Sequence, residues 1–265
     1  MSSFFGFSRA AYYKWRQGIN EADKDAERIF LVKDAWEKSR RVYGYRRVTI
    51  ALQQEGVSIN HKTVLRLMSK MNIRSVARKQ NPYKKGNQLG SYHRYDNILN
   101  RDFKATKPNQ KWVTDISYLR TQQGWGYLST IKDLFDGFIV ACLFRRQNSL
   151  ELVMDTIKQA IQKEKVVDGL LLHSDQGFQY TSDAYFALIT ENKIKPSMSR
   201  RGNCWDNAPM ESFFGHFKEE SLRQYPTPTF EEAQMIVDEY VAFYNYERIQ
   251  LKTKQTPYQT RCLSQ

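Results

Sequence analysis

The chain has 265 residues, of which 41% are hydrophobic, and its 41 Lys and Arg against 28 Asp and Glu give a net charge of +13. This length suffices for one large domain, or for a medium and a small domain, with a sizeable core. The sequence has no apolar run long enough to cross a membrane and no signal-peptide pattern, and its three cysteines are too few and scattered for a disulfide framework or a zinc cluster. We therefore expect a cytoplasmic protein with reduced thiols.

The positive charge is concentrated in the N-terminal part of the chain. Residues 1–110 contain 23 Lys and Arg and 9 Asp and Glu, whereas residues 111–265 contain 18 and 19. A basic segment of this kind indicates a polyanionic partner. Nucleic acid is favoured over lipid and acidic proteins, since no amphipathic membrane helix is evident.

A helical region is predicted for residues 1–73. One amphipathic helix covers about 20–40, a second ends at Gly56, and Asn60 caps a third. The last two, at about 43–73, form a candidate helix-turn-helix, in which the expected inward-facing residues are Val64, Leu65, Leu67 and Met68. The expected DNA-facing residues are His61, Lys62, Thr63 and Arg66. An ordinary helical hairpin is the alternative, and the positive charge favours the helix-turn-helix.

A basic linker is predicted for residues 74–110, which hold nine basic and two acidic residues and little periodicity. This composition indicates an extended segment along a DNA backbone, or a plain solvated linker.

Residues 111–265 have the pattern of a mixed α/β domain. Three strand-like runs separated by glycine turns, at about 112–119, 127–135 and 138–146, predict hairpins. Alternating helices and strands follow, among them the apolar strand GLLLHSD, whose leucines indicate burial on both faces. This is the element order of a ribonuclease-H-like mixed sheet with flanking helices, preceded here by a small all-α domain and followed by a C-terminal helical tail.

Three carboxylates stand out in this domain: Asp115 in the first strand, Asp175 at the carboxyl edge of the fourth, and Glu211 at the start of a helix. Asp115 and Asp175 are 60 positions apart, and 35 residues separate Asp175 from Glu211. If the two strands are neighbours, the two aspartates face one another where open α/β sheets bind ligands. A single Asp at a strand end is usually a cap or turn former, but three such acids at once indicate a site for divalent cations.

The helix that begins near Glu211 has its own start signals. Pro209 suits the first turn, and Asp206 or Asn207 could cap it. Lys218 lies two turns after Glu211 on the same face, where it could contact a DNA phosphate or simply be solvated. Two Mg²⁺ ions roughly 4 Å apart, held by the three acids, would suit an in-line displacement at phosphorus.

The motifs resemble those of the second-reading-frame (OrfB) transposases of the insertion sequence 3 family, in the retroviral-integrase superfamily. The resemblance is carried by WVTDISYL, HSDQGFQYTS, SRRGNCWDNAPMESFFGHFK and FYNYERIQLKTKQTP, and upstream by YGYRRV and FSRAAYYKW. It implies a DDE-type recombinase that uses Mg²⁺, with Mn²⁺ as a substitute, on the terminal repeats of its element. One departure is Arg248-Ile249-Gln250, where the family usually has Arg-x-His.

The resemblance also implies residue roles and partners. Asp115, Asp175 and Glu211 would bind metal, and Lys218 and Arg248 would contact DNA. The same motifs contain further residues whose roles are less defined: His173, Gln179, Tyr180, Asn203, Asp206 and Asn207. The implied partners are double-stranded DNA, further copies of the chain on that DNA, and an upstream reading-frame product normally fused by frameshifting.

Two other functions remain open at this stage. A nuclease of the same fold would use water as the nucleophile where a transposase uses a DNA hydroxyl. A non-catalytic DNA-binding regulator or remnant would keep the fold without the reaction. Tyrosine and serine recombinases are disfavoured, because the 16 tyrosines are scattered and no Arg/His cluster accompanies one.

Overall fold

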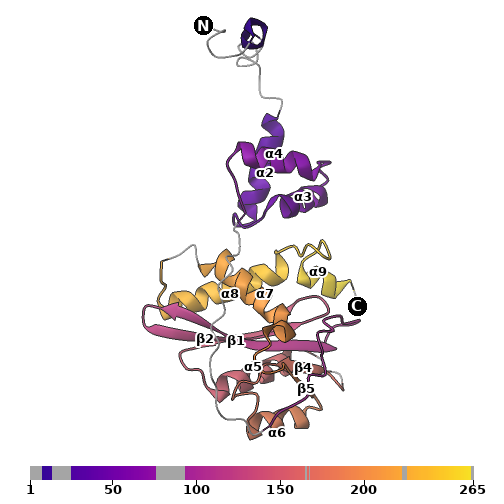
Figure 1. Cartoon of the computed structure of the whole chain (residues 1–265), viewed down its shortest axis with the longest axis vertical. Coiled ribbons are helices and arrows are strands. Elements are labelled where there is room, and N and C mark those ends of the chain that lie inside the picture. Colours follow the sequence, from indigo (N-terminus) through magenta and orange to yellow (C-terminus); the bar gives the residue numbers. More distant parts are fainter. Residues whose placement is uncertain are drawn as a thin grey trace. The chain divides into compact units, whose positions relative to one another are not determined.

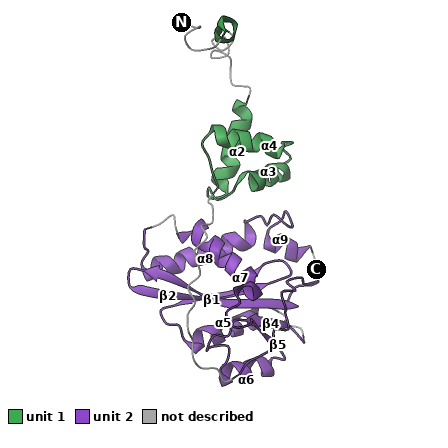
Figure 2. Ribbon diagram, in the orientation of Figure 1, with its two compact units in different colours: residues 1–75 green, residues 76–265 purple. Residues whose placement is uncertain are grey.

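The computed structural model describes residues 8–13, 25–75, 93–164, 166, 168–222 and 226–263 (Figure 1). The chain divides into two compact units, residues 1–75 and residues 76–265 (Figure 2). Within the described ranges, every helix is too short or too polar to cross a membrane.

The first unit is a small bundle of the helices α2 (Ala26–Lys38), α3 (Tyr45–Gln54) and α4 (His61–Lys70). Its buried side chains include Val32, Ala35, Val48, Leu52, Val64, Leu67 and Met68. The predicted cap of α4 is confirmed, since the Asn60 side chain accepts a hydrogen bond from the Lys62 N–H at 2.8 Å. Gly56 follows α3 with φ +85°, as a helix-ending glycine does.

One inward-facing residue of α4 was predicted wrongly. Leu65 is half-exposed, whereas Val64, Leu67 and Met68 are buried. The buried positions follow the i, i+3, i+4 spacing of a helical face, and Leu65 lies off that stripe.

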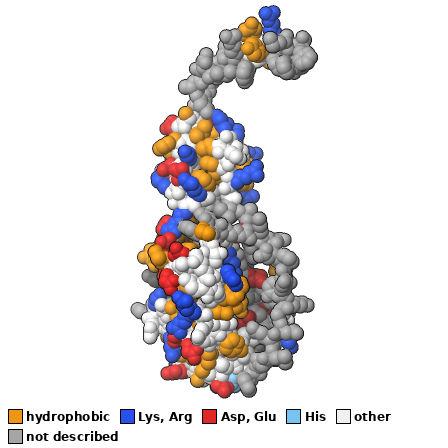
Figure 3. Space-filling model, turned by 90° about the vertical axis from the view of Figure 1, so that its left-hand side faces the viewer, with side chains coloured by type: hydrophobic (Ala, Val, Ile, Leu, Met, Phe, Trp, Pro, Cys, Tyr) orange, Lys and Arg blue, Asp and Glu red, His pale blue; other side chains and the backbone are white. Residues whose placement is uncertain are grey.

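The surface of this unit is rich in positive charge. Residues 25–75 contain 11 Lys and Arg and 5 Asp and Glu. On the face drawn in Figure 3, blue Lys and Arg side chains gather at several places on this unit. This distribution suits contact with the phosphates of a nucleic acid.

The second unit is built on a mixed five-stranded sheet. Its strands are β1 (Lys111–Thr121), β2 (Gly124–Asp133), β3 (Ile139–Arg145), β4 (Leu171–Ser174) and β5 (Lys195–Met198), in the order β3-β2-β1-β4-β5. Antiparallel pairing joins the first three strands, and β4 runs parallel to both β1 and β5. The predicted hairpins, the buried parallel strand and the mixed α/β architecture are confirmed.

Helices cover both faces of this sheet (Figure 1). The helices α5 (Leu150–Lys163) and α6 (Asp183–Glu191) lie on one side, over a core of apolar residues that includes Trp112, Val153 and Leu172. The other side carries α7 (Ala208–Glu220), α8 (Phe230–Tyr246) and α9 (Pro257–Cys262). A short 3-10 helix, η1 (Cys204–Asn207), leads directly into α7.

A glycine in β2 allows close packing beneath α8. A Cβ at Gly126 would lie 2.1 Å from the ring of Phe144, and that ring stacks on Phe230 at 4.6 Å between centroids. A side chain at position 126 would therefore displace the aromatic contact between β3 and α8.

The described part of the predicted linker, residues 93–110, contacts the second unit. The Leu99 N–H donates to Ser197 Oγ at 3.0 Å and its side chain is buried, while the His93 N–H donates to the Thr181 carbonyl. The prediction of an extended linker is therefore wrong for residues 93–110, because hydrogen bonds such as these fix them to the second unit. Residues 76–92 lie outside the described residues.

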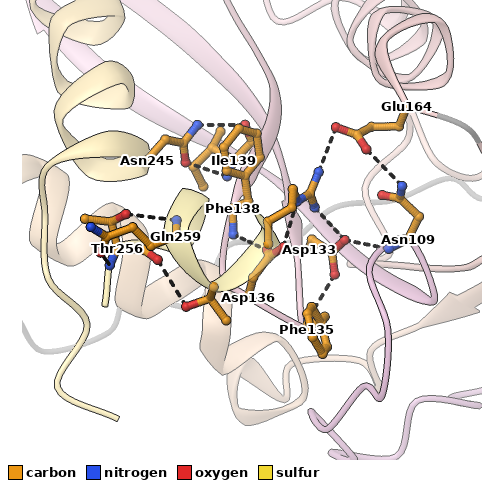
Figure 4. Close-up of polar contacts among 12 residues, drawn as sticks. Asn109, Asp133, Phe135, Asp136, Phe138, Ile139, Glu164, Asn245, Thr256 and Gln259 are labelled. Atoms are coloured by element: carbon orange, nitrogen blue, oxygen red, sulfur yellow. Dashed lines mark hydrogen bonds and ion pairs between the residues drawn. The ribbon is translucent and has the colours of Figure 1, made fainter. Parts of the chain in front are cut away.

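The helix α9, which the prediction of a C-terminal helical tail did not locate as a separate element, is anchored by Arg261. This side chain pairs with Asp133 at 2.8 Å, Asp136 at 2.7 Å and Glu164 at 2.7 Å. Figure 4 shows these three carboxylates with Asn109, whose N–H donates to Asp133 at 2.7 Å. Burial and the neighbouring Asp136 charge raise the pKa of Asp133 to about 6.

Candidate catalytic centre

The strand register places Asp115 and Asp175 side by side. In the parallel pairing of β1 with β4, Lys111 lies opposite Leu171 and Val113 opposite His173, so each partner is 60 positions further along the chain. Asp115 and Asp175 keep this same offset, two residues beyond the last paired position. The 60-residue spacing seen in the sequence is therefore the register of two adjacent parallel strands.

The two aspartates influence one another electrostatically. Burial, and then the negative charge of Asp175, raises the pKa of Asp115 well above its usual value. Asp175 keeps an exposed surface, but the surrounding protein removes enough hydration to raise its pKa too. Each carboxylate accepts a backbone N–H through Oδ1, from Ile116 at 2.8 Å and from Gly177 at 2.9 Å.

Glu211 lies in the first turn of α7, which packs against β1. Its negative charge adds to the shift of Asp115, so the glutamate is near the aspartate pair. The Cys204 thiol hydrogen-bonds the Glu211 carboxylate, and burial together with that charge raises the thiol pKa. Among the described residues, no group of three or more His, Cys, Asp or Glu is already gathered closely enough to hold a metal ion.

Asn207 connects the start of α7 to β1. Its Nδ2 donates to the Thr114 carbonyl at 3.1 Å, directly before Asp115. The predicted capping role is wrong for both candidates, because neither Asn207 nor Asp206 makes a side-chain cap to α7. Asn207 instead fixes the distance between the element that carries Glu211 and the strand that carries Asp115.

Lys218, Tyr180 and Gln179 lie around this centre. Lys218 is half-buried, burial lowers its pKa, and the Asp115 charge opposes that shift, which places its ammonium near the carboxylates. The Tyr180 hydroxyl contacts Thr114 Oγ1 at 3.1 Å, and Gln179 Nε2 donates to Asn148 Oδ1 at 2.5 Å. Both Tyr180 and Gln179 are buried, so they support the loop after Asp175.

Comparisons with known proteins agree with this geometry. Models of an integrase core domain match residues 105–204 and 192–249, and a model of an HTH-like domain matches residues 21–81. The putative transposase InsK for insertion sequence element IS150 of Escherichia coli (strain K12) is 36% identical over 246 residues, which cover 93% of this chain and 86% of that protein. Transposase InsF for insertion sequence IS3A of the same organism is 32% identical, over 81% of this chain and 76% of its own.

The chain belongs to the insertion sequence 3 family of transposases. An uncharacterized 31 kDa protein of insertion element IS600 from Shigella sonnei is also 37% identical over 94% of this chain and 92% of its own length. In fold, the chain is similar to a simian T-cell lymphotropic virus intasome, with a TM-score of 0.52 and 17% identity over 80% of this chain and 69% of that one. The predicted family, fold class and enzyme class, a DDE-type polynucleotidyl transferase, are confirmed.

His173 is a buried structural residue in this transposase. Its side chain is fully buried, with Nδ1 at 2.9 Å from Ser197 Oγ and Nε2 at 3.0 Å from Ser199 Oγ. Burial lowers its pKa from 6.5 to about 4, so the ring is neutral at pH 7. Both ring nitrogens connect β4 to β5 and its following residues, which leaves neither for a metal ion.

The depressed pKa of His173 predicts a loss of stability in mild acid. The unfolded chain binds this proton below pH 6.5, whereas the folded chain binds it only near pH 4. The contribution of neutral His173 to the free energy of unfolding is therefore complete above pH 6.5 and is lost as the pH falls towards 4. Between pH 7.5 and 5 it amounts to about 2 kcal/mol. In urea unfolding, the free energy of unfolding should fall by about 2 kcal/mol more between pH 7.5 and pH 5 in the wild-type chain than in His173→Gln. Equal falls in the two chains would contradict the lowered pKa of His173.

Asp206 anchors the segment in front of α7. It is fully buried and receives hydrogen bonds from Arg200 Nε and Nη2, each at 2.8 Å, from Arg101 Nε at 2.8 Å and from Asn97 Nδ2 at 3.0 Å. These hydrogen bonds, those of Arg200 foremost, hold its pKa far below the usual value. Asn203, in the same motif, donates its N–H to the Arg200 carbonyl at 3.0 Å and so closes the turn.

The predicted DNA contact of Arg248 is wrong. Its side chain is 1% exposed and makes two hydrogen bonds to Glu220, at 2.7 Å and 2.6 Å, while its guanidinium lies over the Tyr244 ring. The Glu220 charge and hydrogen bonds raise the Arg248 pKa against the effect of burial. This side chain holds the end of α7 against the residues after α8, where DNA has no access.

The four predicted DNA-facing residues of the helix-turn-helix lie at the start and middle of α4. His61 and Lys62 are exposed and Thr63 is partly buried, which suits the prediction. Arg66 is also exposed, but it pairs with Asp25 at 2.7 Å and 3.1 Å. Its guanidinium would have to leave or share that partner on contact with a phosphate.

Three residues near the centre were not singled out from the sequence. Cys204 contacts Glu211, and Tyr118 has its pKa raised by burial and by the charges of Asp175 and Asp115. Trp205, between Cys204 and Asp206, is largely exposed. A signal for all three was their position in the same motifs as the acids, in WVTDISYL and GNCWDNAP.

Proposed function

We propose that this chain catalyses metal-dependent DNA strand cleavage and strand transfer at the terminal repeats of an insertion sequence. Asp115, Asp175 and Glu211 are its metal-binding and catalytic residues. The observation that carries the proposal is the β1–β4 register, which brings two carboxylates of raised pKa together beside the start of α7.

The donor atoms fit a hard divalent cation. Carboxylate oxygens are the ligands that Mg²⁺ and Mn²⁺ prefer. Asp115 and Asp175 each use Oδ1 for a backbone N–H, and in the described part of the chain Oδ2 of each makes no hydrogen bond. Two like charges at neighbouring strand ends favour a bound cation, and Glu211, whose charge acts on Asp115, would supply the third ligand.

When bound, two such ions polarise the scissile phosphate and stabilise both the attacking and the leaving oxygen. The residues of the chain bind and orient. The aspartates would hold the ions at the strand ends, and Asn207 keeps α7, with Glu211, against β1. Lys218, with its ammonium near Asp115, is in position to contact a phosphate of the DNA end.

The proposed partners follow from the same reaction. Strand transfer joins two DNA segments, so we infer that several copies of the chain act together on the transposon ends and the target. In each copy, His61, Lys62, Thr63 and Arg66 of α4 would contact the terminal repeat. The upstream reading-frame product would add a second DNA-binding element.

Lys218→Ala is expected to weaken the engagement of a DNA end. The loss of one phosphate contact should raise the Kd for a terminal-repeat duplex about 10- to 150-fold, since a hydrogen bond to a charged group contributes roughly 1.5–3 kcal/mol. Fluorescence anisotropy with Ca²⁺ measures this without the reaction. Unchanged binding together with a lower melting temperature would make Lys218 a structural residue.

A product analysis tests the proposed function. The purified chain is incubated with Mg²⁺ and a labelled duplex that carries the terminal repeat of its own element. Cleaved ends together with joined strands support a transposase, whereas cleaved ends alone favour a nuclease. DNA binding without either product favours the regulator or remnant.

A further inference from the structure

The segment between Arg200 and Glu211 presents an exposed tryptophan beside the carboxylates. Trp205 is 69% exposed, the largest exposed fraction of any Trp in the described part of the chain. It lies in η1, whose last residue, Asn207, contacts the carbonyl of Thr114 directly before Asp115. An exposed indole so close to a reactive centre is available to contact a bound substrate.

The backbone that carries Trp205 is held on both sides. Asp206, the next residue, is fully buried under hydrogen bonds from Arg200, Arg101 and Asn97. On the preceding side, the Asn203 N–H donates to the Arg200 carbonyl at 3.0 Å. The indole is therefore exposed on a fixed turn, which lowers the entropic cost of binding a ligand.

The charge around the indole fits a nucleic acid strand. The two arginines that bind Asp206 keep 55% and 46% of their side chains exposed, Arg200 and Arg101 respectively. Arg201, next to Arg200, is exposed too. An aromatic face flanked by guanidinium groups is the combination that binds an unstacked base together with its phosphates.

Two further aromatic side chains lie around the same centre. Phe178, three residues after Asp175, and Tyr118, three residues after Asp115 in β1, are both about half exposed. The negative charges of both aspartates act on the Tyr118 hydroxyl. An exposed aromatic side chain thus lies within six residues of each of the three acids along the chain.

We propose that Trp205 stacks on a nucleobase that leaves the duplex next to the scissile phosphate. The base loses its stacking and pairing in the helix and gains an aromatic contact, so that the strand can reach the carboxylates. Trp205 is then a DNA-positioning residue of the active site. This inference rests on the proposed function.

The test compares Trp205→Ala and Trp205→Phe with a matched control, Trp125→Ala. Trp125 is 52% exposed in β2, opposite Arg120, five residues along β1 from Asp115 and so roughly 17 Å away. Each variant is given two terminal-repeat substrates, one fully paired and one with three mismatched base pairs beside the cleavage site. Binding is measured by anisotropy with Ca²⁺ and cleavage with Mg²⁺, after melting temperatures have confirmed folding.

We expect Trp205→Ala to lose roughly tenfold or more in binding and cleavage on the paired substrate, in line with the stacking of one base. The mismatched substrate should recover most of the loss in cleavage, because the base is already unpaired. Trp205→Phe should stay within a few-fold of wild type, and Trp125→Ala should equal it. A Trp205→Ala variant that equals wild type, or whose cleavage falls as much on the mismatched substrate as on the paired one, would overturn the inference.

The outcome for the wild-type chain separates the two proposals. If the wild-type chain binds but does not cleave either substrate, the proposed function fails. Stacking by Trp205 is then decided by the binding data alone. Tighter binding of the mismatched duplex that is lost in Trp205→Ala supports it, and equal binding of both duplexes contradicts it.

Discussion

Asp115→Asn is expected to abolish strand cleavage while leaving the metal-free chain at least as stable as wild type. Burial and the Asp175 charge raise the pKa of Asp115, so the ionised form of this carboxylate destabilises the folded state. An amide removes that repulsion, and each kcal/mol gained raises the melting temperature of a domain of this size by roughly 2–4 °C. Cleavage should fall by roughly 10³-fold or more, because bound metal ions contribute several kcal/mol to such reactions.

The response to Mg²⁺ distinguishes this account from simple misfolding. A ligand that binds only the folded state adds about 2.7 kcal/mol of stability at a hundredfold excess over its Kd. Mg²⁺ should therefore raise the melting temperature of the wild-type chain and leave that of Asp115→Asn almost unchanged. The same Mg²⁺ response in both chains would remove Asp115 from the metal site.

Arg261→Ala is expected to lower the free energy of unfolding by several kcal/mol. The substitution leaves Asp133 and Asp136 buried without their cation, and removes the pairing to Glu164. Removal of one partner from a buried ion pair typically costs about 3–5 kcal/mol. Urea unfolding followed by tryptophan fluorescence measures the loss, since the buried Trp112 donates to Asn109 of the same network.

The matched control is Arg145→Ala, which also removes one ion pair. The Arg145–Asp155 pair has the same 2.7 Å separation, but both side chains are partly exposed. Surface pairs contribute at most about 1 kcal/mol. Equal effects of the two substitutions would show that burial of the Arg261 network adds nothing to the stability.

The sequence predicted the catalytic unit well because its signals are local. Alternation and turn glycines located β1, β2 and β3, and a short leucine run located β4. The carboxylate spacing was visible as well. The pairing of β1 with β4 could not be predicted from local signals. In that pairing each residue lies opposite the one 60 positions later, which places Asp115 beside Asp175.

The wrong predictions concern contacts between distant residues. An arginine is usually exposed, so the sequence suggests a surface position for Arg248. Its burial depends on the pairing with Glu220, which lies 28 residues earlier in α7. Residues 93–110 show no periodicity, because they pack through single side chains such as Leu99 and through backbone hydrogen bonds. The start of α9 had a local signal that was overlooked, the capping box formed by Thr256 and Gln259.

Strand joining by Glu211→Gln tests the central claim most directly. Wild-type chain and variant are incubated with Mg²⁺, a labelled terminal-repeat duplex and target DNA, and joined product is quantified. If Asp115, Asp175 and Glu211 form one metal-dependent centre, the wild type gives joined product and the variant gives none, although it folds and binds the duplex normally. Joined product from Glu211→Gln at the wild-type rate would contradict the assignment.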